Sequence, residues 1–214
     1  MPRRRRPSPR GRGAPPGELR LIAGEHRGRK LKVPRGQVAR PMRANVREAL
    51  FNVLGPVEGL RVLDLFAGSG SLGCEALSRG AAHVTFVERA APCLEVLAHN
   101  VALLGAEERA RVLRHDLARG LPRDPREACE LVLMHPPFPL MRQRPERGEA
   151  DVDALIAEVA RDPRFTEARL AFEAPREVAY TDARLHEWGF SEVWRRDYGT
   201  TTVFVCSRAS GSRG

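Results

Sequence analysis

The 214-residue chain is long enough for one large domain, and its composition is that of a packed protein with a strongly basic beginning. Hydrophobic residues make up 42% and charged residues 29%, and no apolar run approaches the roughly 18 residues of a membrane helix. The formal net charge is +9, yet residues 1–47 hold 15 Lys/Arg against two acids, so the remainder carries a net charge of −4. A basic N-terminal segment on an otherwise mildly acidic chain favours a polyanionic partner that binds at this segment.

Residues 1–18 are almost entirely Arg, Pro, Gly and Ser, a composition that predicts disorder. They lack the apolar stretch of a secretory signal, and the four cysteines are scattered without a CxxC pair. We therefore expect reduced thiols, a cytoplasmic location and no metal. Two interpretations of the tail stay open, a nucleic-acid arm or a solubilising arginine-rich extension.

Residues 19–58 predict a β-hairpin followed by a helix. The segments LRLIAG and RKLKVP alternate around EHRG, and the only two lysines of the chain, Lys30 and Lys32, lie on this hairpin. In NVREALFNVLG, apolar residues at positions 46, 49, 50, 53 and 54 follow helical spacing. Asn45 is the predicted N-cap, with Glu48 completing a capping box.

From residue 60 the pattern alternates between strand and helix. The predicted strands are RVLDLF, HVTFVE, ARVLRHD, CELVLMH and ARLAFEA, and the predicted helices are SLGCEALSRG, APCLEVLAHNVALLG and a segment around DVDALIAEVAR, with 139–150 as a polar loop. The stretch SEVWRRDYGTTTVFVCSR predicts two strands joined at Tyr198-Gly199. We expect an α/β fold whose mostly parallel sheet ends in an antiparallel hairpin. The expected divisions are a tail at 1–18, the hairpin and helix at 19–58, the sheet domain at 59–208 and a flexible tail at 209–214.

The glycines of VLDLFAGSGSLGCEAL fall between a strand and a helix, where they let the backbone turn tightly and approach a ligand. Glu88 ends the next strand, 20 residues after Gly68, where an acid can accept hydrogen bonds from ribose hydroxyls. NAD and S-adenosylmethionine both fit this pattern. Asp64 favours the methionine cofactor, because a carboxylate there can meet an amino group that NAD lacks. Asp116 ends the third strand and can accept from an adenine N6 amine, or alternatively cap a turn.

The run LVLMHPPFPLM ends a buried strand abruptly, because two prolines remove ladder donors. The fourth strand of such a sheet ends beside the first, so His135 and the residues after it would face the reactive end of the cofactor. A carbonyl of Pro136 or Pro137 and a side-chain acceptor could receive both hydrogens of a planar amine, while Phe138 stacks on the base. That arrangement suits an N-methyltransferase acting on a nucleobase. The alternatives are a backbone-capping role for His135 and core packing for Phe138.

These motifs resemble the RsmD-type family, the bacterial 16S rRNA (guanine-N2)-methyltransferases. The resemblance runs from Leu19 to Arg208 and is carried by LRLIAGEHRGRKLKVP, VREALFN, VLDLFAGSGSLGCEALSRGA and VTFVE. It implies a Rossmann-like class I methyltransferase fold with seven strands, S-adenosylmethionine as donor, and 16S rRNA or a small-subunit assembly intermediate as partner. We expect a monomer.

The resemblance also assigns roles by position. It implies cofactor contacts from Asp64, Phe66, Ala67, Gly68, Ser69, Gly70, Glu88, Asp116 and Leu117, and catalytic roles for His135, Pro136, Pro137 and Phe138. The basic N-terminal hairpin that it implies would contact RNA phosphates, with the candidate residues Arg20, Arg27, Arg29, Lys30, Lys32, Arg40 and Arg43.

Two departures from the family pattern affect the functional hypothesis. The motif of the family is usually Asp-Pro-Pro-Tyr or Asp-Pro-Pro-Phe, whereas this chain has His135, and its loop Arg40-Pro41-Met42-Arg43-Ala44 lacks the usual threonine and acid. Asp offers two acceptor oxygens, whereas a neutral imidazole offers one acceptor and a protonated one offers none. Three hypotheses stay open: His135 positions the amine, the site serves another base or nucleic acid, or the chain binds RNA without transferring a methyl group.

Overall fold

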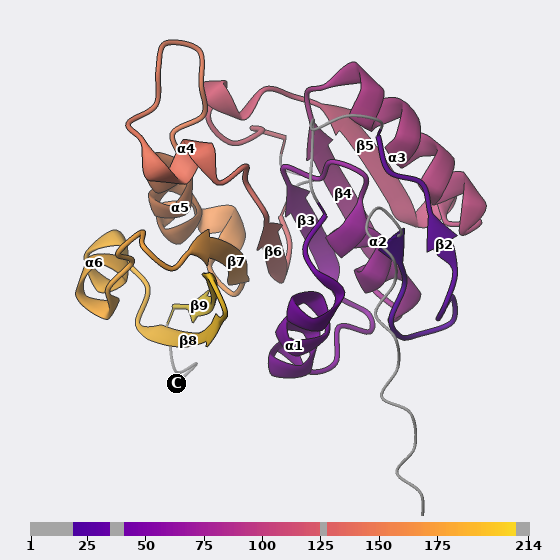
Figure 1. The fold of residues 1–214 in the computed structure, drawn as a ribbon, viewed down its shortest axis with the longest axis horizontal. Coiled ribbons are helices and arrows are strands. Elements are labelled where there is room, and N and C mark those ends of the chain that lie inside the picture. The colour runs from indigo at the N-terminus through magenta and orange to yellow at the C-terminus, as the bar shows by residue number, and fades with distance from the viewer. Residues whose placement is uncertain (1–18, 35–40, 125–127, 209–214) are drawn as a thin grey trace, which may run out of the picture.

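The computed structural model describes residues 19–34, 41–124 and 128–208, and seven of the described strands form one sheet (Figure 1). They are β3 (Arg61–Leu65), β4 (His83–Glu88), β5 (Ala110–Arg114), β6 (Leu131–Met134), β7 (Arg169–Pro175), β8 (Glu192–Tyr198) and β9 (Thr201–Ser207). Their order is β5-β4-β3-β6-β7-β9-β8; β3 to β7 run parallel, and β9 is antiparallel to both β7 and β8. The predicted seven-stranded, mostly parallel α/β fold is therefore confirmed.

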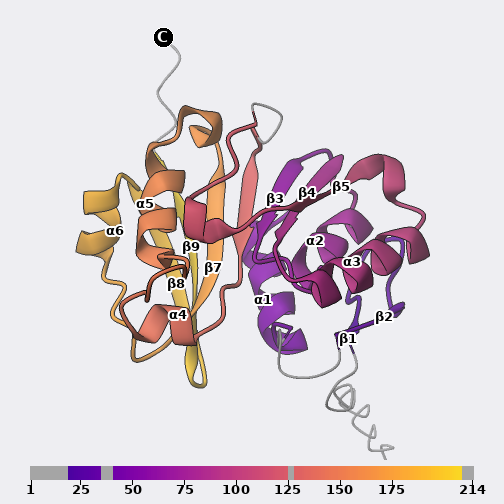
Figure 2. The same cartoon turned by 90° about the horizontal axis from the view of Figure 1, so that it is seen from above.

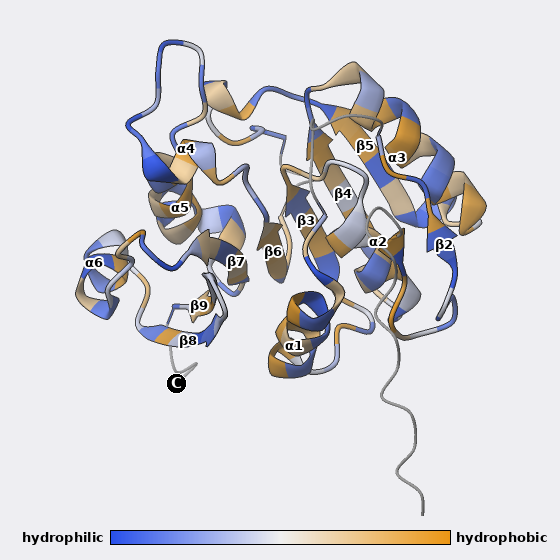
Figure 3. Ribbon diagram, in the orientation of Figure 1, coloured by the Kyte–Doolittle hydropathy of each residue, from blue (hydrophilic) through white to orange (hydrophobic). Residues whose placement is uncertain are grey.

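Helices cover both faces of the sheet (Figure 2). The helices α1 (Ala44–Leu54), α2 (Ser71–Ser78) and α3 (Ala91–Leu103) share one core, and α4 (Pro139–Arg142), α5 (Val152–Arg161) and α6 (Asp182–Trp188) share the other. Side chains along a strand alternate between the cores: Leu131 and Leu133 face α1 to α3, whereas Val132 and Met134 face α4 to α6. The central strands are accordingly hydrophobic on both sides (Figure 3).

The predicted N-terminal hairpin is present as two short antiparallel strands, β1 (Leu19–Arg20) and β2 (Lys30–Leu31). It lies against α2, where the Glu25 amide donates to the Ser78 carbonyl at 2.8 Å. Gly24 has a φ of +80°, and a Cβ there would lie 1.6 Å from the same carbonyl oxygen. The apolar residues of the hairpin, Leu19, Leu21 and Leu31, join the core of α1 to α3, so the hairpin and α1 pack against the same face of the sheet.

A buried carboxylate on α2 holds the hairpin in place. Glu75 accepts from the amides of Ile22 and Ala23 at 2.9 and 3.1 Å and from Arg79 at 2.8 Å. Arg47 of α1, which is also buried, lies 3.6 Å from Glu75, and burial lowers the pKa of Arg47 although that carboxylate opposes the shift. Because a buried charge is costly unless it is paired and hydrogen-bonded, these bonds stabilise one mutual arrangement of hairpin, α1 and α2.

Two local predictions were wrong. The first helix begins at Ala44, and its N-cap is Arg43, not Asn45, with no side-chain capping bond. Arg43 is held instead by a turn distant in sequence, since its guanidinium donates to the Tyr198 carbonyl at 2.8 Å and to Thr201 Oγ1 at 3.2 Å.

The loop predicted for 139–150 starts with the short helix α4, which has Pro139 in its first turn. The two predicted C-terminal strands are confirmed, and the turn that joins them is at Gly199 and Thr200, one residue later than predicted.

The described part of the chain contains no helix with both the length and the apolarity to cross a bilayer. Within the same residues, no three His, Cys, Asp or Glu side chains gather as a metal site, and Cys74, Cys93, Cys129 and Cys206 are free and buried.

Candidate functional site

Four neighbouring strands present the predicted site residues at one edge of the sheet. In the order β5-β4-β3-β6, the carboxyl ends of the strands lead into Asp116, Glu88, the glycine loop (residues 66–70) and His135. The Gly68 amide donates to Glu88 Oε2 at 2.9 Å, and the His135 amide lies 3.5 Å from the Leu65 carbonyl. The structure thus brings together the cofactor and motif residues that the sequence pattern predicted.

Asp64 lies buried beneath the glycine loop, where its Oδ2 accepts from the Gly73 amide at 2.9 Å. Burial raises the pKa of Asp64 to about 7; the Gly73 bond opposes the shift and the charge of Glu88 adds to it. Gly73 itself serves packing, since a Cβ there would lie 2.2 Å from the Phe86 ring. Asp64 therefore fixes the first turn of α2 against the end of β3.

The glycine loop turns sharply through backbone conformations that ordinary residues disfavour. Gly68 and Gly70 have φ values of +57° and +80°, and Phe66 has a φ of +58°, the only positive φ of a non-glycine residue in the described part. A Cβ at Gly70 would lie 2.5 Å from the Leu97 side chain. A non-glycine residue in the left-handed region stores strain, a feature that clusters at functional sites.

Glu88 connects the glycine loop to the start of α3. Besides the Gly68 bond, its Oε1 accepts from the amides of Arg89 and Ala90 at 2.7 and 2.8 Å. The half-buried carboxylate is thereby held in one orientation at the end of β4. A fixed carboxylate at this position suits the predicted hydrogen bonds from ribose hydroxyls.

Asp116 caps a short 3₁₀ turn, because its Oδ1 accepts from the Ala118 amide at 3.1 Å. Arg89 Nη1 lies 3.3 Å from both oxygens of this carboxylate. Burial alone would raise the pKa of Asp116, but the Ala118 bond and the Arg89 charge together lower it. The capping role considered from the sequence is present, on a carboxylate that also stands beside Glu88 at the sheet edge.

The acceptor groups at this sheet edge fit S-adenosylmethionine. Glu88 and Asp116 are acceptors on adjacent strand ends, as hydroxyl and amine donors of an adenosine require. The positive-φ glycines turn the loop backbone across the strand ends, where the Gly68 amide meets Glu88, and Leu117, next to Asp116, is buried. Glu88 would hold the ribose, Asp116 the adenine, and the loop from Phe66 to Gly70 the methionine portion.

The proline motif, residues 135–138, follows β6. One of its two proline carbonyls already accepts a backbone hydrogen bond, and the other is a candidate acceptor for a substrate. The Pro137 carbonyl accepts from the Leu140 amide at 3.0 Å, so Pro136 is the better acceptor for a substrate amine. The ring of Phe138 lies 6.1 Å from the His135 ring at an interplanar angle of 70°, and it is half-buried. Arg142 stands 5.8 Å over the same ring.

One residue of this site was missed by the sequence reasoning. Glu173 of β7 is buried, and its Oε2 lies 3.1 Å from His135 Nε2. The two positions are neighbours because Met134 pairs with Phe172 in the parallel ladder. A signal was available: Glu173 is the only acid in the predicted strand ARLAFEA and follows the apolar run Leu170–Phe172, and a buried acid requires a partner.

The predicted RNA-contacting residues fall into two groups. Arg27, Arg29, Lys30 and Lys32 are exposed on the hairpin, and Arg20 is half-buried there, with its Nη1 donating to the Gly28 carbonyl at 3.2 Å. Arg43 lies apart, immediately before α1, with its guanidinium bonded to the turn between β8 and β9, and Arg40 falls outside the described residues.

Asn100 of α3 connects this hairpin to the glycine loop. Its Nδ2 donates to the carbonyls of Lys32 and Ser69, each at 2.9 Å, and its Oδ1 accepts from the Lys32 amide at 2.9 Å. Asn100 is fully buried, so these bonds satisfy its polar atoms away from water. The basic hairpin and the proposed cofactor loop therefore share one side chain.

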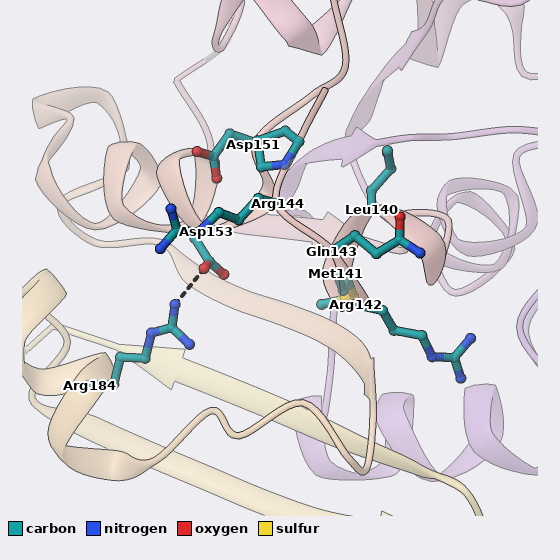
Figure 4. A pocket seen from close by; sticks show the side chains of 9 residues that line it. Leu140, Met141, Arg142, Gln143, Arg144, Asp151, Asp153 and Arg184 are labelled. Carbon is teal, nitrogen blue, oxygen red and sulfur yellow. Dashed lines mark hydrogen bonds and ion pairs between the residues drawn. The ribbon is translucent and has the colours of Figure 1, made fainter. Parts of the chain in front are cut away.

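A pocket of about 620 Å³ opens beside α4 (Figure 4). Its lining comes from α4, the loop after it, α5 and α6, namely Leu140, Met141, Arg142, Gln143, Arg144, Pro145, Asp151, Asp153 and Arg184. Arg184 pairs with Asp153, and Arg142 pairs with Glu177 at 2.7 Å. Because these positive charges meet carboxylates, we assign no anion site to this pocket.

Known proteins resemble the chain in both sequence and structure. The family model described as "Conserved hypothetical protein 95" matches residues 19–206. "Ribosomal RNA small subunit methyltransferase D" of Escherichia coli (strain K12) is 42% identical over 128 residues, which cover 57% of this chain and 61% of that protein. "Putative rRNA methyltransferase YlbH" of Bacillus subtilis is 44% identical over 104 residues, or 48% of this chain and 56% of that protein. The chain thus matches less than two thirds of the length of these relatives.

The solved structure titled "Putative methyltransferase yhhF from Escherichia coli" has a TM-score of 0.71 and 30% identity to the chain. The match covers 91% of this chain and 100% of that structure, and so includes both the hairpin and the sheet. With the family model spanning the hairpin, the glycine loop and the proline motif, these matches establish family membership. The chain therefore belongs to the family described as Conserved hypothetical protein 95, the RsmD-type methyltransferase family.

Proposed function

We propose that this chain transfers a methyl group from S-adenosylmethionine to the exocyclic N2 of a guanine in small-subunit rRNA. The observation that carries the proposal is the placement of two carboxylates, a glycine loop and an amine-accepting proline motif along four adjacent strand ends. The named activity of the relatives supports RNA as the substrate class. An rRNA substrate would also place the protein in the cytoplasm.

Each group at the sheet edge has a task in this reaction. When bound, S-adenosylmethionine would supply an electrophilic methyl group, and this chain would orient the amine toward it. The Pro136 carbonyl and a nitrogen of His135 would each accept one amine hydrogen, and Phe138 would stack on the flipped base. Because two acceptors hold both hydrogens, the amine lone pair is aimed by position.

The exposed hairpin cations supply affinity for RNA. Arg27, Arg29, Lys30 and Lys32 stand where phosphates could be met without entering the sheet edge. Phosphate contacts fix register but carry little sequence information, so the base is selected at the motif.

Methyl transfer to isolated 30S subunits and to naked 16S rRNA tests the proposal. We expect tritium from the methyl group of the cofactor to enter RNA and to be recovered, after digestion, as N2-methylguanosine. Glu88→Gln should weaken cofactor binding in calorimetry and lower transfer in parallel. Transfer to another atom would contradict the guanine N2 assignment, and cofactor binding unchanged by Glu88→Gln would contradict the ribose assignment.

A binding protein without activity is the second candidate, because His135 stands where the family pattern has Asp. The variant His135→Asp separates the two functions. Activity present in the natural chain and reduced in His135→Gln supports an enzyme that uses histidine. Activity found only in His135→Asp would show that the natural chain binds RNA without modifying it.

A further inference from the structure

The histidine of the proline motif does not stand alone, because a carboxylate on the next strand faces it. Ala171 of β7 belongs to the core of α1 to α3, so Glu173, two positions later on that strand, points to the same side. His135 is the first residue after β6, and its ring meets Glu173 there. The His135 side chain is 18% exposed and that of Glu173 is 3% exposed, with 3.1 Å between Nε2 and Oε2. The partner of the histidine is therefore buried while the ring reaches the surface.

Glu173 has positively charged and polar neighbours besides its burial. Burial alone would raise the pKa of Glu173, but the facing His135 and the positive charge of Arg43 together lower it. Arg43 in turn donates to Thr201 Oγ1 at 3.2 Å. A carboxylate that is buried on a strand of the sheet and kept ionised in this way is a fixed acceptor beside the ring.

A fixed acceptor determines which ring nitrogen carries the proton. An ionised carboxylate only accepts hydrogen bonds, so the nitrogen facing it must be the N–H donor, and a neutral imidazole then has a lone pair only on its other nitrogen. The contact at Nε2 leaves Nδ1 as that acceptor. This is the state that a histidine needs to receive a hydrogen from a substrate amine.

We propose that Glu173 is a positioning residue that holds His135 as the Nε2–H tautomer, so that Nδ1 accepts a hydrogen from the target amine. The inference rests on the proposed function for its substrate. The amine lone pair forms the new N–C bond while the bond from the methyl group to the sulfonium sulfur of the donor breaks and leaves its electron pair on sulfur. The nitrogen must then lose one proton: its N–H bond breaks and an Nδ1–H bond forms. The resulting imidazolium then faces the Glu173 carboxylate through Nε2–H, and its extra proton later passes to solvent. His135 and Glu173 together thus supply the negative charge that an Asp would supply alone.

The tautomer can be measured without any activity. In protein labelled with ¹⁵N-histidine, the ring signals of His135 are identified by their loss in His135→Gln. We expect neutral His135 to be protonated at Nε2 in the natural chain and in the control Glu192→Gln, which changes an exposed acid of β8. In Glu173→Gln we expect a mixture of tautomers or the Nδ1–H form. Glu173→Asp keeps the charge but is shorter by one methylene, so it should also reduce the Nε2–H form of His135. This variant replaces Glu173→Gln in the measurement if the Gln variant does not fold.

Kinetics separate positioning from a merely structural role. General acid–base groups contribute about 10²–10⁴-fold, so a misplaced base should cost Glu173→Gln roughly tenfold to a hundredfold in kcat with little change in KM. A natural His135 protonated at Nδ1, a tautomer unchanged in both Glu173 variants, or an unchanged kcat despite a changed tautomer would each overturn the inference. If the natural chain transfers no methyl group, the proposed function fails, and the tautomer measurement alone decides whether Glu173 fixes the ring.

Discussion

The buried carboxylate of Asp64 fixes the glycine loop through a hydrogen bond, but its burial lowers the stability of the folded protein at neutral pH. Its carboxylate holds the Gly73 amide, yet full burial raises its pKa to about 7. In the unfolded chain the same group ionises near its ordinary value of 3.8. Between these values the folded state binds the extra proton, so the free energy of unfolding falls as the pH rises.

Asp64→Asn should therefore stabilise the protein at neutral pH. Asn keeps an acceptor for the Gly73 amide but never ionises, and each unit of pKa shift corresponds to about 1.4 kcal/mol. We expect the variant to gain a few kcal/mol over the natural chain at pH 7 and nothing at pH 4, measured by urea unfolding without cofactor. A gain that is equal at both pH values would show that Asp64 does not titrate in this range.

The residues at the strand ends were predictable because a parallel sheet places them together. Glu88, Asp116 and His135 each follow a strand that the alternating pattern located, so their common edge followed from the strand order. The engaged carbonyl of Pro137 was not predictable, and the sequence could indicate that Glu173 needs a partner but not that His135 is that partner. Both depend on local backbone and on strand register, which residue types alone do not determine.

At the level of elements, the hairpin depends on one close backbone contact with α2. Gly24 and Gly28 share a φ of +80°, but a Cβ at Gly24 would strike the Ser78 carbonyl, whereas a Cβ at Gly28 would meet nothing within 4 Å. The pair therefore separates the cost of a positive φ from the cost of lost packing. Sequence alone treats the two glycines alike.

Gly28→Ala should cost about 1–2 kcal/mol of stability, the strain of a left-handed alanine. Gly24→Ala should cost several kcal/mol more, because it must push the hairpin off α2. Thermal unfolding of both variants measures the difference, and amide exchange at Ile22 and Ala23 should rise in the Gly24 variant only. Equal losses in the two variants would show that the hairpin is not held by this contact.

The start of α1 illustrates why helix ends are harder to predict than helices. The apolar spacing located the helix correctly, but the capping pattern at Asn45 and Glu48 selected the wrong first residue. Arg43 is held by Tyr198 and Thr201, whose contact no local pattern reveals. The short helix α4 was missed for a related reason, since four residues are too few for a periodic signal.

For the whole molecule, positive charge is concentrated at one end of the chain, and four of its exposed cations, Arg27, Arg29, Lys30 and Lys32, lie on the hairpin. RNA binding should therefore depend strongly on salt, with each phosphate contact adding about 0.7 to 0.9 to the slope of log K against log salt. Lys30→Gln with Lys32→Gln should lower the slope by roughly 1.5. Arg161→Gln, an exposed charge on α5 across the sheet, should leave it unchanged. A slope unaffected by the lysine pair would place the RNA elsewhere.

Asn100 makes the geometry of the hairpin and that of the glycine loop interdependent, because one amide group bonds both Lys32 and Ser69. Whatever ligand steadies one side should ease the ordering of the other, and such linkage is reciprocal by thermodynamic necessity. RNA should therefore raise the affinity for S-adenosylhomocysteine, the spent cofactor, by the same factor as that molecule raises the affinity for RNA. In Asn100→Ala the two affinities should become independent. An enzyme with this coupling would bind its methyl donor more tightly once the RNA substrate is bound.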